Sequence, residues 1–189
     1  MIEVEIRGTL TDEEYETLSS FLKKEGELVE SQEREMILLR GYDGYSPNPN
    51  ERDVDIRLRN TNGVCEIMVK RKTSDHNVAR HEASLPLGCT DLEPAKEAMK
   101  ALGYSEGLWM HRKKDVYRYK NIEWSIVDVP EGLRYFEAEQ EVHDPSEAEA
   151  VHLLLTKEAE ALGLKGMGPE EMRDFISKLD SKVNKQITW

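Results

Sequence analysis

Apolar and polar residues alternate with a period of two at the start of the chain, where the sequence reads IEVEIR. The aliphatic residues share one side of the predicted strand, and the other side carries Glu3, Glu5 and Arg7. Similar alternating or apolar stretches predict eight strands, near residues 2–8, 30–41, 53–60, 63–72, 78–86, 107–118, 121–129 and 134–142.

Helix starts are indicated where Thr or Ser is followed three residues later by Glu, the pattern of a capping box. This pattern occurs at Thr11, Thr90 and Ser146, and each is followed by apolar residues at helical spacing. A fourth helix is expected from Pro169, because proline suits the first helical turn. The pattern therefore predicts helices between and after the strands.

Turn residues separate these elements. The Asn-Gly pair in NTNG at 60–63 predicts a hairpin, and YKN at 119–121 predicts a second tight turn. The segment 41–52 is expected to be a loop because it is rich in Gly, Pro and Asn. With no repeat or linker, residues 1–189 are expected to form a single α+β domain.

Several of the other predicted strands also carry ionisable residues at i, i+2 spacing on one side. These charges face water if the sheet is open, whereas they line an enclosed space if the sheet closes, and closure also removes exposed strand edges. The basic residues at these positions are Arg57, Arg59, Lys70, Lys72, Arg80, Arg112 and Lys114. The acidic ones, besides those of the first strand, are Glu82, Glu137 and Glu139.

Both sets of like charges repel themselves unless ions of the opposite sign join them. A polyphosphate held by the bases, with a divalent cation bridging phosphate and carboxylates, satisfies both sets. The strand that opens the chain is therefore expected to help line a site for metal and phosphate.

Composition narrows the classes of partner. The net charge of -12 over 189 residues argues against nonspecific binding to nucleic acid, which needs a basic surface. No signal peptide or long apolar run is present, so we expect a cytoplasmic protein without a membrane partner. Cys65, Cys89 and the five histidines lack the spacing of a metal site.

The charged strands also resemble a known family in their order along the chain. EVEIR resembles the ExExK signature of CYTH-domain proteins, the triphosphate tunnel metalloenzymes, which include thiamine triphosphatases, inorganic tripolyphosphatases and class IV adenylyl cyclases. DIRLR, IMVKRK, ARHE, RKKDVY and VDVPEGLRYFEAE are similar to the later strands of that family, and the correspondence spans roughly residues 1–142.

This resemblance implies a closed eight-stranded antiparallel β tunnel with surrounding helices and a C-terminal helix. It implies that Mg²⁺ or Mn²⁺ is held by Glu3, Glu5, Glu137 and Glu139, and by Asp128 if that side chain points inward. Triphosphate oxygens would be held by the seven basic residues named above together with Arg7. Glu82 or Glu139 would accept the proton of the attacking water.

Two departures from the family pattern concern the site. Arg7 replaces the signature lysine, and arginine can hold phosphate but cannot serve as a base. The turn EGLRYF lacks the second glycine of the family's GLG sequence.

The leading hypothesis is metal-dependent hydrolysis of inorganic tripolyphosphate or of a small organic triphosphate such as thiamine triphosphate. The alternatives are an adenylyl cyclase of the same fold and a noncatalytic tunnel that binds polyphosphate. A monomer or a homodimer is expected.

Overall fold

The computed structural model describes residues 2–48, 51–72 and 79–189. Position 78, where the fifth strand was expected to begin, lies outside the described residues. The principal elements are β1 (Ile2–Thr9), α1 (Asp12–Glu25), β2 (Glu27–Leu39), β3 (Val54–Thr61), β4 (Val64–Lys72), β5 (Ala79–Pro86), α2 (Glu93–Ala101), β6 (Glu106–Tyr119), β7 (Ile122–Val129), β8 (Leu133–Val142), α3 (Ala148–Ala161), α4 (Pro169–Lys182) and β9 (Lys185–Thr188).

Hydrogen bonding joins the strands in the order β2-β3-β4-β5-β1-β8-β7-β6-β9, and β2 also pairs with β6. Strands β1 to β8 therefore close into an eight-stranded antiparallel β barrel, which confirms the predicted fold class. The described residues also contain four α-helices, the last of them near the C-terminus. Strand β9 was not predicted, and it extends the sheet beside β6.

The chain divides into two compact units, each built from separate stretches. Unit 1 comprises Met1–Gln32, Thr73–Arg80 and Arg112–Gly168. Unit 2 comprises Glu33–Lys72, His81–His111 and Pro169–Trp189. Each unit has a hydrophobic cluster of its own.

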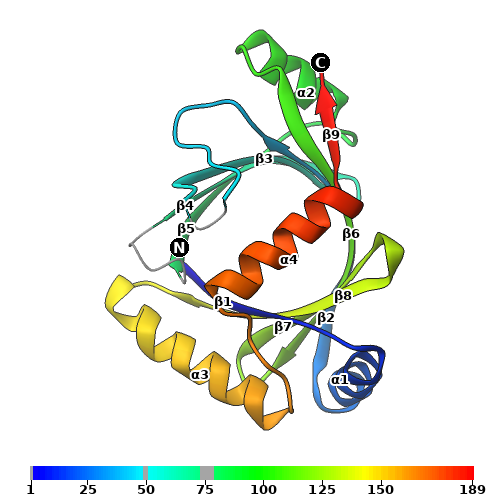
Figure 1. Ribbon diagram of the computed structural model, residues 1–189, viewed down its shortest axis with the longest axis vertical. Helices are drawn as coiled ribbons and strands as arrows, with labels where there is room; N and C mark the ends of the chain where they lie inside the picture. The colour runs from blue at the N-terminus through cyan, green and yellow to red at the C-terminus, as the bar shows by residue number, and fades with distance from the viewer. Residues whose placement is uncertain (1, 49–50, 73–78) are drawn as a thin grey trace. The chain divides into compact units, whose positions relative to one another are not determined.

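The core of unit 1 forms against the aliphatic side of β1. Val4 is fully buried, and the burial of β1 alternates along its length as the sequence pattern predicts. Helix α3 runs alongside β1 in Figure 1, and its Leu155 joins the same cluster as Trp124 and Phe136. Because this side of the sheet is packed, the charged side chains of β1 are held on the opposite side.

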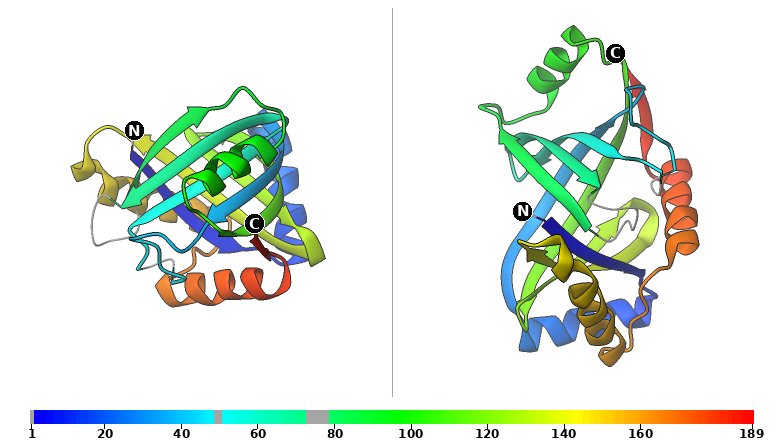
Figure 2. Two further views of the ribbon diagram at one scale, coloured as in Figure 1. Left: turned by 90° about the horizontal axis from the view of Figure 1, so that it is seen from above. Right: turned by 90° about the vertical axis from the view of Figure 1, so that its left-hand side faces the viewer.

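The core of unit 2 forms where α2 packs against β2, β3 and β4, an arrangement visible in Figure 2. Leu92, Ala95 and Met99 contribute the helical part, and Leu58 and Cys65 contribute part of the strand side. None of the helices in the described part of the chain has the length and apolar character needed to cross a membrane.

The predicted turns and one of the predicted caps are confirmed. Asn62 and Gly63 both have positive φ, as do Lys120 and Asn121, which is the geometry of tight hairpin turns. Thr11 caps α1, because its side chain accepts a hydrogen bond from the backbone of Glu14 and the Glu14 carboxylate binds the Thr11 amide.

The other two predicted caps are wrong. Helix α2 has Leu92 at its N-cap, and the Glu93 amide is bound by the side chain of Asp91. Before α3, Asp144 caps a short 3₁₀ turn that precedes the helix. In both places an aspartate near the start competes with the Thr or Ser as a backbone acceptor.

Candidate functional site

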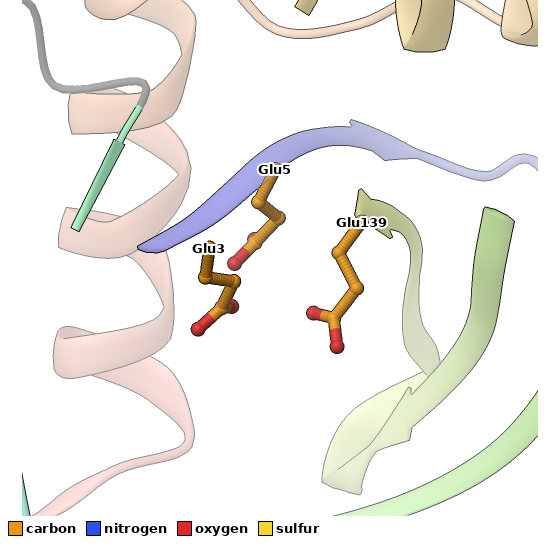
Figure 3. A group of neighbouring side chains, drawn as sticks. All are labelled: Glu3, Glu5 and Glu139. Atoms are coloured by element: carbon orange, nitrogen blue, oxygen red, sulfur yellow. The ribbon is translucent and has the colours of Figure 1, made fainter. Parts of the chain in front are cut away.

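Three carboxylates from β1 and β8 form a cluster in unit 1, which we call the acid group: Glu3, Glu5 and Glu139. One carboxylate oxygen of each lies within 4.8 Å of one from each of the other two. The antiparallel register places Glu5 directly opposite Glu139. Figure 3 shows the three side chains extending into the same space from the two strands.

The acid group carries unfavourable electrostatic energy. The pKa of Glu139 is raised to about 9, mainly by burial and also by the negative charges of Glu3, Glu5 and Glu137, against the opposing effect of Lys114. A carboxyl group with this pKa is protonated at neutral pH. A cation bound between these carboxylates would therefore relieve repulsion that the protein alone leaves in place.

The acid group fits a hard divalent cation. Mg²⁺ and Mn²⁺ prefer carboxylate oxygens, and the three glutamates offer such atoms at the mutual spacing of ligands that share one ion. Three of the five predicted metal ligands are thus brought together by the structure. The other two, Glu137 and Asp128, have different surroundings.

Glu137 is buried and bound by two cations. Its Oε1 lies 2.9 Å from Arg7 Nε, and its Oε2 lies 3.0 Å from Lys114 Nζ. Arg7 also contacts Glu5, donating from Nη2 to Oε2 at 3.1 Å. Burial opposes the charged form of Arg7, but Glu5 and Glu137 outweigh this and raise its pKa well above the ordinary value. Arg7 and Lys114 are therefore positive charges fixed beside the acid group.

Two further residues of unit 1 lie near these charges and were not predicted. Tyr135 has the same parity as Glu137 on β8, and its pKa is raised by burial and by Glu137, against the effects of Arg7, Arg112 and Lys114. Ser125 on β7 is almost fully buried and pairs with Glu137 in the register. Parity with Glu137 along β8 could have identified Tyr135, whereas Ser125 is placed beside Glu137 only by the register between β7 and β8.

Asp128 lies on the other side of its strand. It shares parity with Trp124 and Ile126, which belong to the hydrophobic cluster of unit 1. Its Oδ1 is 3.9 Å from Arg134 Nε, and Arg134 in turn binds Asp12 at the start of α1. The structure does not bring Asp128 to the acid group.

The remaining predicted bases of unit 1 are placed on separate strands. Arg112 is buried on β6, two residues before Lys114, and Arg80 is half-buried on β5. Arg112 lies close enough to Tyr135 to influence its pKa.

In unit 2, four predicted phosphate-binding residues lie on β3 and β4, and we call them the basic group: Arg57, Arg59, Lys70 and Lys72. Antiparallel pairing sets Arg59 opposite Glu66 and Asp55 opposite Lys70, so these side chains share one side of the sheet. All four members of the basic group are at least half-buried.

Acids from the same unit pair with the basic group. Arg59 Nε lies 2.6 Å from Glu66 Oε1 and its Nη2 lies 3.5 Å from Glu82 Oε1. Lys70 Nζ lies 2.9 Å from Glu82 Oε2. Glu82, predicted to be catalytic, is therefore held by two bases, whereas Glu139 belongs to the acid group.

Asp55 was not predicted to have a role, although its parity with Arg57 was visible in the sequence. It is 1% exposed and lies between two arginines, 2.6 Å from Arg57 Nη2 and 2.9 Å from Arg52 Nη1. Arg52 belongs to the loop that precedes β3, and no periodic signal marks it.

The chain is similar in sequence to a curated archaeal protein. The chain is 29% identical over 153 residues to a Methanocaldococcus jannaschii protein named "Putative adenylate cyclase", covering 80% of this chain and 83% of the relative. No protein-family model matches the chain.

Solved structures share the fold. A protein from Vibrio parahaemolyticus, described as a "putative adenylate cyclase", superposes with a TM-score of 0.69 at 13% identity, over 91% of this chain and 98% of the other. A "putative adenylyl cyclase" from Hippeastrum, described as having a dominant triphosphatase activity, superposes with a TM-score of 0.58 at 15% identity, over 94% and 95% of the two chains. At these identities the likeness establishes the fold alone.

Proposed function

We propose that this protein hydrolyses a triphosphate with the help of Mg²⁺ or Mn²⁺. The observation that carries the proposal is the acid group, in which burial and neighbouring carboxylates raise the pKa of Glu139 to about 9. Even with Arg7 and Lys114 nearby, the pKa of Glu139 stays raised, so a bound cation would stabilise its charged form.

The acid group would hold the ion through Glu3, Glu5 and Glu139. A divalent ion bound there supplies positive charge that stabilises the developing negative charge of a phosphoryl group in transfer. Arg7 and Lys114 are fixed beside the same carboxylates by their bonds to Glu137. They would hold phosphate oxygens and orient the chain of phosphates relative to the carboxylates.

The basic group supports the same class of substrate. Together with Arg52 it places five cations on and beside β3 and β4. Clustered arginine and lysine side chains of this kind can bind a polyanion through charge-assisted hydrogen bonds. Phosphoryl transfer depends mainly on positioning and charge neutralisation, and these residues can provide both.

Phosphate release is the direct test. The purified chain would be incubated with inorganic tripolyphosphate, thiamine triphosphate or ATP, in Mg²⁺, in Mn²⁺ and in a chelator. We expect metal-dependent release of phosphate from at least one substrate. Absence of release from all three, in both metals, would contradict the proposal.

Formation of cyclic AMP from ATP is the second candidate, because the sequence relative and both structural neighbours bear the name of adenylyl cyclases. The triphosphatase activity ascribed to the Hippeastrum protein supports hydrolysis as the first. Chromatography of the ATP reaction separates the two, because a cyclase yields cyclic AMP and pyrophosphate, whereas a hydrolase yields ADP and phosphate.

A further inference from the structure

Asp55 is a buried carboxylate whose two oxygens bind different arginines. Arg52 Nη1 donates to Oδ1 at 2.9 Å, and Arg57 Nη2 donates to Oδ2 at 2.6 Å. A carboxylate removed from water is stable only when ionic partners and hydrogen bonds replace its solvation. The three side chains thus form one unit, which we call the Arg52–Asp55–Arg57 triad.

Arg52 is the anchored end of the triad. It is 6% exposed, its Nε donates to the Ser46 carbonyl at 2.8 Å, and its guanidinium lies 5.0 Å from the centre of the Tyr45 ring. These contacts join it to the loop before β3. Because its guanidinium has these protein contacts, Arg52 is suited to hold Asp55 in place. Arg57 is the more exposed of the two arginines, with 19% of its side chain accessible.

The backbone around Asp55 is fixed as well. The Tyr42 hydroxyl donates to the carbonyl of Val54 at 2.6 Å and accepts a hydrogen bond from the amide of Ile56 at 3.2 Å. These bonds hold the residues on both sides of Asp55. The carboxylate is consequently a rigid point from which Arg57 is oriented.

The charges of the three side chains also favour anion binding at Arg57. Asp55 and Arg57 alone would form a neutral pair with little attraction for an anion. Arg52 adds a second positive charge behind the carboxylate, so the triad has a net charge of +1 with Arg57 as its more exposed end.

We propose that Arg52 and Asp55 are positioning residues for anion binding: Asp55 aims Arg57, and Arg52 offsets the charge of Asp55 so that Arg57 attracts phosphate. This inference rests on the proposed function, because it gives the basic group a triphosphate to bind. Neither Arg52 nor Asp55 needs to touch that anion.

Charge rescue tests the inference. Binding of inorganic tripolyphosphate would be measured by calorimetry in a chelator, so that no turnover occurs. Arg52→Met makes the triad neutral and should weaken binding about tenfold, which corresponds to about 1.4 kcal/mol. The double variant Arg52→Met with Asp55→Asn restores a charge of +1 and keeps an amide oxygen that can accept a hydrogen bond from Arg57, so it should recover most of that loss.

A merely structural role predicts the opposite order. If the triad only ties the loop to β3, the double variant removes both ends of the tie and cannot bind better than Arg52→Met. Equal binding by Arg52→Met and the native chain, or no recovery in the double variant, would overturn the inference. Arg71→Met, an exposed residue of β4, is the matched control and should bind as the native chain does.

Two further variants keep the test decisive if Arg52→Met does not fold. Arg52→Lys keeps the charge of the triad and should bind tripolyphosphate within about threefold of the native chain, whereas Arg52→Gln removes the charge but keeps a hydrogen-bond donor and should bind about tenfold more weakly. Equal binding by these two variants would overturn the inference. Native binding that Arg52→Met leaves unchanged, or a native chain that binds no tripolyphosphate in the chelator, overturns this inference alone. The proposed function is contradicted only by the absence of phosphate release in both metals.

Discussion

The acid group of unit 1 and the basic group of unit 2 differ in how their buried charges are compensated. In the basic group, Arg57, Arg59 and Lys70 each have a carboxylate within 3 Å. In the acid group, repulsion and burial raise the pKa of Glu139 because its neighbours include three other carboxylates. Unit 2 therefore has a network of ion pairs, and unit 1 has a group of acids that a bound cation would stabilise.

Because of this difference, mutations in the basic group and in the acid group should have different effects on stability and on activity. Removing a charge from the paired network should destabilise the protein, because a partner is left buried without compensation. Removing a charge from the acid group should relieve repulsion and yet abolish metal binding. The following predictions test that contrast, beginning with the largest effect.

Glu139→Gln should lower metal-dependent phosphate release about 100-fold, because it removes an anionic ligand from the acid group. The metal-free variant should unfold at a temperature no lower than that of the native chain, since a neutral amide replaces a carboxyl group that ionises with difficulty. Phosphate release and thermal unfolding in a chelator measure the two effects. Glu160→Gln, an exposed change on α3, serves as the control.

If Glu139→Gln retained native phosphate release, Glu139 would not be a ligand of the metal. A large loss of stability in the same variant would show that Glu139 is a structural carboxylate, contrary to the contrast between the two units.

Arg59→Met should lower the free energy of unfolding by roughly 1–2 kcal/mol, because Glu66 and Glu82 lose a partner. The side chains of Arg59 and Glu66 are 14% and 17% exposed, so solvent screens their pairing only in part. Urea unfolding measures the change. Arg71→Met, at an exposed residue of β4, should stay within about 0.5 kcal/mol of the native chain. Equal stability of the two variants would contradict the paired network.

The pH dependence of stability should distinguish the acid group again. The folded-state pKa of Glu139 is about 9, above the ordinary value of 4.5, so between these values the folded state binds more protons than the unfolded state. Its contribution to stability is present below pH 4.5 and is lost as the pH rises through 9.

Unfolding of the native chain and of Glu139→Gln, compared from pH 5 to pH 9 in a chelator, isolates this contribution. The stability of the native chain relative to the variant should fall as the pH rises. A relative stability that is constant or that increases would refute the assigned electrostatics of the acid group.

Local sequence signals predicted the elements of the fold more completely than they predicted the residues of the site. The alternation of β1, the cap at Thr11 and the Asn-Gly turn depend on neighbours in sequence, and the structure confirms each. Strand β9 escaped prediction because its four residues form a short edge strand with no clear period. Asp91 and Asp144 displaced the predicted caps because several acceptors compete at a helix start.

The selection of site residues depends on register across strands, which a single strand does not reveal. Glu137 and Glu139 have the same parity, yet register sets Glu139 opposite Glu5 and Glu137 opposite Arg7. Only the first pairing adds to a cluster of acids. Arg52 was hidden for a different reason, because a loop has no periodicity from which the position of a side chain can be inferred.

Arg7→Lys should have the smallest effect, and it tests whether arginine at this position is compatible with catalysis. Arg7 contacts both Glu5 and Glu137, and lysine keeps the charge while losing the planar fork that joins them. We therefore expect phosphate release to fall about threefold, with Arg118→Lys on the exposed part of β6 unchanged. A native chain that only binds polyphosphate would instead gain hydrolysis in Arg7→Lys, because lysine would restore the residue that the ExExK signature carries. The direction of the change thus decides between a triphosphatase that uses arginine and a binding protein that lost its activity with the lysine.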